Sequence, residues 1–290
     1  MNFLNNTHNT MMNSNTISDD WFNILMATTA EARKKRSFLP KFRTQTHSLM
    51  KYIALICTKL KYSSEIEFAA LDTIDHFFMN KFLNLMQCID NESEAVKIRK
   101  IHEIHEEMQM YGVLQSLCIL LLCAKNYGTY VYVELDTITD LIRATHNRFS
   151  TKVIKQCELY TFKQLNYQLE KPITFYFVEY FILKICNLLL GVEADELGAA
   201  CDSLLRLCYV YRDMICQCFV KYFCSKAFID LLLQDKCLLA AAVTYIVLNK
   251  KTAITKKLLD IALDKISDWS LVEKHDIICF SKCIVNVLKI

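Results

Sequence analysis

Glycine and proline, the residues that make tight turns, are almost missing from this chain. Its 290 residues include four glycines and two prolines, against roughly 7% and 5% in average proteins. Sandwiches and barrels need turn residues at short intervals, so this scarcity excludes most all-β folds. Gly112, Gly128, Gly191 and Gly198 also lie too far apart to form a glycine-rich phosphate loop. The sequence therefore predicts an all-α fold, with helices joined by short connections.

The overall composition indicates a folded protein with large hydrophobic cores. Hydrophobic residues make up 53% of the chain and charged residues 22%, a balance that argues against general disorder. The formal charge of +3 is small for this length. Proteins that bind duplex DNA usually carry a strongly basic face, so direct nucleic-acid binding is not expected.

The cysteines and the apolar runs indicate the cellular compartment in which the protein is expected. None of the fourteen cysteines forms a CxxC pair, and most lie inside apolar helical runs. We therefore expect free thiols that act as small core residues in a reducing compartment. No stretch reaches the ~18 uninterrupted apolar residues of a membrane span, so no membrane partner is expected. These features favour an intracellular protein.

Residues 1–40 have the composition of a leader. They are rich in Asn, Thr and Met, with one apolar spot at Trp21–Met26, and we expect a mobile segment that holds one short docking helix. The run Arg33, Lys34, Lys35 and Arg36 follows. Such a run is typical either of a nuclear import signal or of a solvated helix end. Pro40 then breaks the chain, because proline cannot continue a helix.

The remaining chain divides into two helical halves. Apolar residues recur at helical spacing from residue 41 onward, and Pro172 marks the predicted boundary between domains 41–172 and 173–290. Ser64 and Glu67 have the spacing of a capping box at a helix start. Residues 83–110 are highly charged and predict a helical insertion, whereas residues 113–124 are apolar on all sides and predict a central helix. The halves are similar in length and helix count, which suggests a duplicated five-helix unit.

No group of residues in this sequence has the pattern of a catalytic or metal site. His102, His105 and Glu106 form the densest cluster, but their spacing is not that of HExxH, and their charged segment favours a solvated face. The chain also lacks a GxSxG nucleophile motif. We therefore expect no enzymatic activity, no metal and no cofactor.

Three charged residues interrupt apolar helical runs and require an explanation. Lys125 ends the most apolar helix, Glu158 lies at the edge of an apolar stripe, and Asp75 lies inside another such run. An ionised group in such a place costs free energy unless it is paired or bound. Either these groups are satisfied within the chain, by ion pairs or a lysine that reaches solvent, or Lys125 and Glu158 form a polar hook for a partner protein.

Several segments, in order along the chain, resemble the cyclin box. Residues 74–77 (IDHF) resemble the family's YIDRF segment, and residues 114–125 (LQSLCILLLCAK) resemble its third helix, LQLVGxAALLIAxK. Residues 144–172 resemble the end of the box, ITDxxYTKxQVLxMExxILxxLxFxLxxPT, and match it without a gap from Glu158 to Pro172. The resemblance covers about residues 41–180, and the rest of the chain only by its helical pattern.

The resemblance implies a fold, a partner and a set of residue roles. It implies two tandem five-helix bundles, the second one divergent, with the charged insertion between helices 2 and 3 of the first. Cyclins are non-catalytic subunits that pack on the regulatory helix of a cyclin-dependent kinase. The family's kinase-binding Lys and Glu correspond to Lys125 and Glu158, and its structural Asp and Leu to Asp75 and Leu114.

Departures from the cyclin pattern narrow the resemblance further. The family's first helix reads MRAILVDWL, but here its Arg and Trp positions hold Thr46 and Tyr52. The groove that captures RxL substrate motifs is therefore not implied. The insertion, this missing motif and a long second-half helix are similar to the cyclin N-terminal domain-containing proteins, which act in meiotic crossover maturation. That likeness implies a nuclear, chromosome-associated protein that works beside meiotic recombination proteins.

Other functions stay open at the level of sequence. One alternative is another divergent cyclin that regulates the cell cycle or transcription. A second is a cyclin-box adaptor that binds DNA or protein assemblies without a kinase. The adaptor would need clustered basic residues on one face, and the candidates are Lys97, Arg99 and Lys100, then Lys250, Lys251, Lys256 and Lys257.

Overall fold

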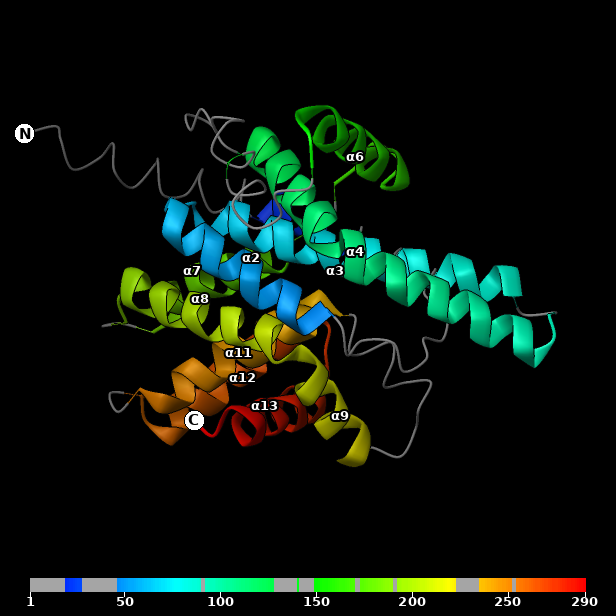
Figure 1. The fold of residues 1–290 in the computed structure, drawn as a ribbon. Coiled ribbons are helices and arrows are strands. Elements are labelled where there is room, and N and C mark those ends of the chain that lie inside the picture. The colour runs from blue at the N-terminus through cyan, green and yellow to red at the C-terminus, as the bar shows by residue number, and fades with distance from the viewer. Residues whose placement is uncertain are drawn as a thin grey trace, which may run out of the picture. The chain divides into compact units, whose positions relative to one another are not determined.

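The computed structural model describes residues 19–27, 46–89, 92–127, 140, 149–169, 173–189, 192–222, 235–251 and 254–290. All regular secondary structure in these residues is helical (Figure 1), which confirms the predicted all-α class. The principal helices are α2 (Thr46–Leu60), α3 (Ser64–Ile89), α4 (Glu94–Tyr127), α6 (Thr151–Gln164), α7 (Thr174–Leu188), α8 (Ala194–Val210), α9 (Arg212–Tyr222), α11 (Lys236–Lys250), α12 (Lys256–Ser270) and α13 (Lys274–Leu288). The basic run at Arg33, Lys34, Lys35 and Arg36 lies outside the described residues, as does most of the helix expected near 134–145.

The chain forms two compact units. Unit 2 contains residues 39–173 together with 206–213, and unit 1 contains residues 1–38, 174–205 and 214–290. The chain passes from unit 2 to unit 1 between residues 173 and 174, beside Pro172, where the sequence predicts a domain boundary. The assignment of residues 206–213 to unit 2 has no counterpart in the sequence pattern, because these residues belong to the second half of the chain.

Helix α4 is the central helix of unit 2. It packs against α2, α3 and α6, and its second half is buried on nearly every side, with Leu114 only 1% exposed. The prediction of a central helix over 113–124 is thus confirmed. Gly112 marks a close approach of two helices, since a Cβ atom there would lie 3.4 Å from the Leu49 side chain of α2.

Among the described helices, α4 is also the one that is long and apolar enough to cross a membrane by length and composition. Its most apolar 18-residue window has a mean hydropathy of 1.4, and 67% of that window is buried inside the protein. Core helices of folded domains pass the same test. Burial within unit 2 therefore accounts for the apolar character of α4.

Two helix starts in unit 2 illustrate local capping. Ser150 caps α6, because its hydroxyl accepts a hydrogen bond from the Val153 amide. At α3 the predicted capping box between Ser64 and Glu67 is wrong, because other residues make the expected hydrogen bonds. The hydroxyl that accepts from the Ile66 amide belongs to Ser63, one residue before the helix, and the Glu67 carboxylate binds Arg206 instead. A capping box needs the glutamate to reach back to the helix start, and a distant cation holds it here.

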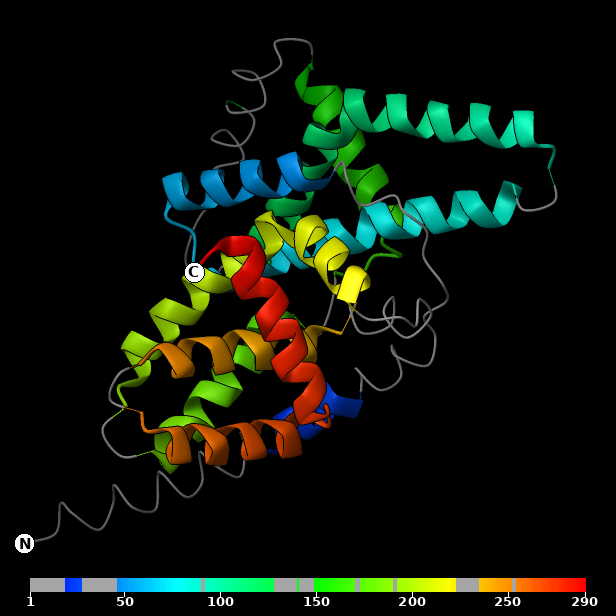
Figure 2. The ribbon, with the colours of Figure 1, turned by 90° about the horizontal axis from the view of Figure 1, so that it is seen from below.

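The charged insertion predicted over 83–110 lengthens two helices and adds no separate element. The end of α3 and the beginning of α4 run side by side beyond the rest of unit 2 (Figure 2). An ion pair of 2.5 Å between Lys81 and Glu107 joins the two helices near the base of this hairpin. The insertion is therefore a helical hairpin that continues the core helices outward.

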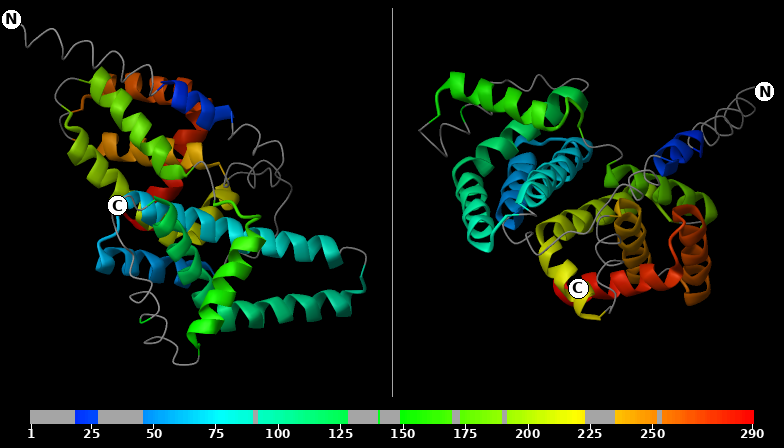
Figure 3. Two further views of the ribbon diagram at one scale, coloured as in Figure 1. Left: turned by 90° about the horizontal axis from the view of Figure 1, so that it is seen from above. Right: turned by 90° about the vertical axis from the view of Figure 1, so that its right-hand side faces the viewer.

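Helix α11 holds the central position in unit 1. It packs against α7, α12 and α13 (Figure 3), and eleven of its fifteen residues are buried. The Asp235 carboxylate accepts hydrogen bonds from the Cys237 and Leu238 amides and so caps the helix start. The helical stretch expected over 194–225 divides at Tyr211 into α8 and α9, although no glycine or proline signals a break there.

Residues 19–27 are helical and dock on α7 in unit 1. Phe22 and Leu25 are buried in this contact, and each buried side chain of this size contributes about 1.5–3 kcal/mol. Packing against α7 therefore stabilises this part of the leader.

Candidate functional site

The structure brings Lys125 and Glu158 together. Lys125 lies in the last turn of α4 and Glu158 in the middle of α6, and these two helices pack against each other in unit 2. The Lys125 Nζ atom donates a hydrogen bond to Glu158 Oε1 at 2.5 Å. Their side chains are 49% and 16% exposed. The two groups that the sequence singled out thus form one polar feature on the surface of unit 2.

The energetics of this pair leave it available to a partner. An ion pair with a solvent-exposed member contributes only about 0–1 kcal/mol to stability, because water screens the charges. The observed bond uses one of the three donors of the ammonium group. Rearrangement around a partner would therefore cost little, while a desolvated contact with both groups would be strong and directional.

Two large apolar side chains of α6 are also exposed. Leu159 and Tyr160 follow Glu158 directly and are 52% and 44% exposed. Burial together with the nearby Glu107 carboxylate raises the pKa of the Tyr160 hydroxyl, so Tyr160 stays neutral at physiological pH. Because successive side chains of a helix are about 100° apart, Leu159 and Tyr160 lie on other faces of α6 than Glu158 does. We call Lys125 and Glu158 the hook surface.

A pair of cysteines lies between α4 and α6 beside the hook surface. The buried Cys118 thiol is 3.9 Å from the Ile154 carbonyl oxygen of α6. Interaction with the neighbouring Cys118 thiol lowers the pKa of the half-buried Cys157 thiol against the opposing effect of burial, and the Thr161 hydroxyl and the Lys81 ammonium lower it further. The same pairing raises the pKa of Cys118. Cys157 is therefore the more reactive thiol of the two.

This difference predicts a selective alkylation pattern. At pH 7.4 iodoacetamide should modify Cys157 faster than Cys186, because the thiolate is the nucleophile. Cys186 is a matched control, since it is also half-buried but burial raises its pKa. Peptide mass spectrometry over a time course measures both rates. Equal rates at the two cysteines would contradict this assignment.

The two residues that the resemblance marks as structural lie inside unit 2. Leu114 is buried in the core around α4. Asp75 on α3 is only 14% exposed, and its carboxylate lies 3.5 Å from the guanidinium of Arg212 on α9. The cation beside Asp75 thus comes from a segment more than 130 residues later in the sequence.

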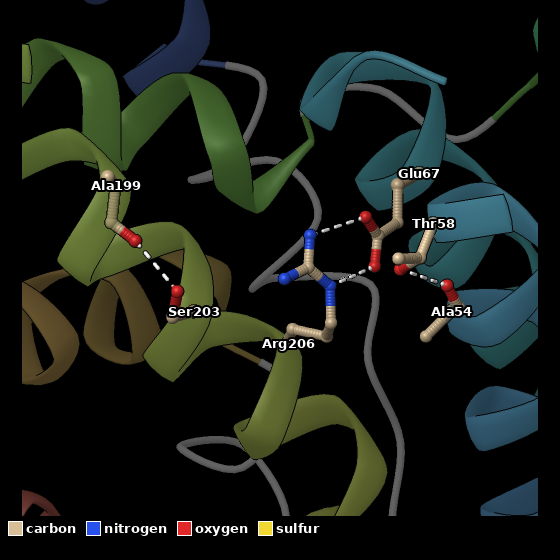
Figure 4. Close-up of polar contacts among 6 residues, drawn as sticks. All are labelled: Ala54, Thr58, Glu67, Ala199, Ser203 and Arg206. Atoms are coloured by element: carbon tan, nitrogen blue, oxygen red, sulfur yellow. Dashed lines mark hydrogen bonds and ion pairs between the residues drawn. The ribbon is translucent and has the colours of Figure 1, made fainter. Parts of the chain in front are cut away.

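Asp75 belongs to a row of polar contacts between α3 and residues 206–212. Arg206 donates two hydrogen bonds to the buried Glu67 carboxylate, at 2.6 and 2.7 Å (Figure 4). Tyr209 donates its hydroxyl hydrogen to buried Asp72. Sequence reasoning missed these partners. A signal was present, because Arg206, Tyr209 and Arg212 recur every three residues and so share one helical face.

The other candidate clusters do not assemble into sites. His102 lies 3.4 Å from Glu106, and both side chains are well exposed, as expected for a solvated face. In the described part of the chain no group of three His, Cys, Asp or Glu side chains could hold a metal ion. Cys216 is buried and Cys218 half-buried on α9, while Cys224 lies outside the described residues.

Three of the basic residues considered for nucleic-acid binding are held in ion pairs. Arg99 and Lys100 pair with Glu103 and Glu92, and residues 83–110 contain six acidic residues against three basic ones. Lys251 pairs with Glu196 at 2.6 Å. Phosphate binding relies on unneutralised lysine and arginine, so these pairings argue against the adaptor reading.

Comparison with known proteins adds no relative. No protein-family model matches the chain, and no curated protein has a sequence that matches it.

Proposed function

We propose that this protein is a cyclin-like, non-catalytic subunit that binds a cyclin-dependent kinase through the hook surface. In this proposal unit 2 corresponds to a first cyclin box and unit 1 to a divergent second one. The observation that carries the proposal is the Lys125–Glu158 pair, with its 2.5 Å contact and its position on the surface of unit 2. The sequence resemblance assigns kinase binding to these same two positions.

The chemistry of the hook surface suits a helix or loop of a partner protein. Side by side, an ammonium and a carboxylate offer donors and acceptors that complement the exposed backbone groups at a helix end. The exposed side chain of Leu159, on the adjoining face of α6, adds apolar area to this part of unit 2. A regulatory helix of a kinase, anchored at one end by polar contacts and along its side by apolar ones, matches this surface.

The test removes both charges and measures kinase binding. In a Lys125→Ala/Glu158→Ala double variant, co-purification with cyclin-dependent kinases should be lost, because losing charge-assisted contacts at a desolvated interface costs about 2–5 kcal/mol. The matched control is Lys274→Ala/Asp264→Ala, which removes an ion pair of the same 2.5 Å length, with 50% and 55% exposed side chains, from unit 1. The control should bind as the unaltered protein does.

Two further readouts sharpen this experiment. Far-ultraviolet circular dichroism should show unchanged helicity in both variants, since each pair includes a lysine whose side chain is about half exposed. Kinase binding should also slow the alkylation of Cys157, which precedes Glu158 on α6. Wild-type binding by the Lys125→Ala/Glu158→Ala variant would overturn the proposal.

We further propose that the protein acts in the nucleus, at chromosomal sites of meiotic recombination, where it promotes crossover formation or maturation. This part rests on the likeness to the cyclin N-terminal domain-containing proteins, for which the charged insertion over residues 83–110 is one of the sequence features. Its test is the expression pattern. Transcripts confined to meiotic germ cells would support it, whereas uniform expression in dividing tissues would favour an ordinary cell-cycle or transcriptional cyclin.

A further inference from the structure

Two cysteines from different helices meet inside unit 2, where α4 packs against α6. Cys118 lies on α4 and Cys157 on α6. The Cys118 sulfur is 3.9 Å from the carbonyl oxygen of Ile154, which lies one turn before Cys157 on the same helix. The two thiols also interact directly with each other. Both sulfur atoms therefore lie at one point of the contact between the helices.

The packing of α6 holds Cys157 at this contact. Ile154, Cys157 and Thr161 are three and four residues apart, so they share one face of the helix. Ile154 and Thr161 are the buried residues of α6, and the Cys157 sulfur lies 4.0 Å from the Thr161 hydroxyl oxygen. Cys157 therefore belongs to the face of α6 that packs on the rest of unit 2.

The two thiols differ in their access to solvent. Cys118 is only 1% exposed, whereas Cys157 is half-buried. A small solute can therefore reach the Cys157 sulfur, while Cys118 is enclosed. The pKa of Cys157 is lowered as described above, which favours the nucleophilic thiolate. A partly exposed, acidic thiol beside a second thiol is the arrangement of a redox-sensitive cysteine and its resolving partner.

A second pair of cysteines, in unit 1, provides a comparison within the same chain. Cys186 on α7 is half-buried and Cys201 on α8 is buried, and the two are close enough for Cys186 to affect the pKa of Cys201. Burial raises the pKa of both thiols. This pair matches the first in exposure and in proximity, but it lacks a thiol with a lowered pKa.

We propose that Cys118 and Cys157 form a peroxide-sensitive pair, which is reversibly oxidised to a disulfide that links α4 to α6. The substrate class is a hydroperoxide. In the reducing compartment that the cysteine content predicts, the pair is a dithiol, and it becomes a disulfide when the hydroperoxide concentration rises. The inference concerns the thiols of unit 2 and does not depend on the kinase-binding function proposed above.

The reaction takes place in two steps. The Cys157 thiolate attacks one oxygen of hydrogen peroxide, the O–O bond breaks, and Cys157 becomes a sulfenic acid while hydroxide leaves and takes up the proton that the thiol had released. The Cys118 sulfur then attacks the Cys157 sulfur, the S–O bond breaks, and the Cys118 proton leaves with the hydroxyl group as water. In sum, two thiols lose two electrons and two hydrogen atoms, and one peroxide is reduced to two waters.

The first test uses the reduced, unaltered full chain and hydrogen peroxide in small molar excess. After N-ethylmaleimide has blocked the remaining thiols, mass spectrometry of a non-reducing digest should show the Cys118 and Cys157 peptides joined, two hydrogen atoms lighter than the two reduced peptides together. Dithiothreitol should separate them again. Cys186 and Cys201 should stay reduced under conditions that convert most of the first pair.

Two variants assign the roles of the two thiols. In Cys118→Ala the joined peptide should be lost and sulfenic acid should accumulate at Cys157, where dimedone labels it. In Cys157→Ala the Cys118 thiol should stay reduced, because burial shields it from the oxidant. Circular dichroism checks that both variants keep their helicity, and the cross-link in the unaltered chain is measured without any variant.

Several outcomes would overturn the proposal. One is oxidation of Cys157 in the unaltered chain without a link to Cys118, and another is a chain in which both thiols stay reduced. Linkage of Cys186 to Cys201 at the same rate would show that exposure and proximity alone decide the reaction. Joined peptides found only in the dimer band of a non-reducing gel would assign the bond to two copies of the chain.

Discussion

Replacing Arg206 by alanine should lower the free energy of unfolding by about 3–5 kcal/mol, because it leaves a buried carboxylate without its cation. Glu67 is only 2% exposed, and Arg206 gives it two charge-assisted hydrogen bonds. The Arg206 side chain is itself 34% exposed, so water that enters the vacated volume compensates the buried carboxylate only in part. Urea denaturation followed by circular dichroism at 222 nm measures the change.

Two controls separate this effect from the general loss of an arginine. Arg99→Ala removes a 70% exposed guanidinium that lies 3.7 Å from Glu103, and it should cost less than about 1 kcal/mol. The double variant Glu67→Met/Arg206→Leu should recover much of the stability, since it removes the buried charge together with its partner. A loss below about 1 kcal/mol for Arg206→Ala would show that the ion pair is not what secures this contact.

Replacing Phe219 by alanine should have an effect of similar size in unit 1. The Phe219 side chain on α9 is fully buried, and its ring meets the Phe280 ring of α13 edge to face, with centroids 5.3 Å apart. Truncation removes that aromatic contact and leaves a cavity. Substitutions of this kind cost about 3–5 kcal/mol, which the midpoint of urea unfolding would report.

The control for Phe219 lies on the same helix. Met214 is half-exposed on α9, so Met214→Ala also removes apolar atoms from this helix but opens no cavity. Its effect should stay within about 0.5 kcal/mol. Similar losses for the two variants would mean that the interior of unit 1 is not packed around Phe219 as the structure describes.

The sequence predicted well those structural features that depend only on neighbouring residues. The apolar run at 113–124 became the buried half of α4, since a helix that is apolar on every side must be enclosed by others. Ser150 caps α6 as the sequence predicted. This cap was predictable because capping depends on neighbouring residues alone. The capping box of Ser64 and Glu67 was wrong for a non-local reason, namely the cation of Arg206.

The candidate site was predictable only in part. Lys125 and Glu158 were identified as candidates because an unpaired charge in an apolar stripe costs free energy. The structure shows the two groups in contact. The reactive thiol next to them, Cys157, was not distinguishable from the other cysteines. Its properties come from Cys118 and Lys81, which lie on other helices.

The amino-acid sequence by itself determined the all-α class and the positions of most helices. Both follow from the scarcity of turn residues and from the 3.6-residue apolar period, which are properties of neighbouring residues. Only the tertiary structure decided the partners of Glu67, Asp72 and Asp75 and the docking of Phe22 on α7, because the paired residues are more than 130 positions apart. Such contacts form when helices pack, and no local pattern specifies which distant side chain will meet a buried charge.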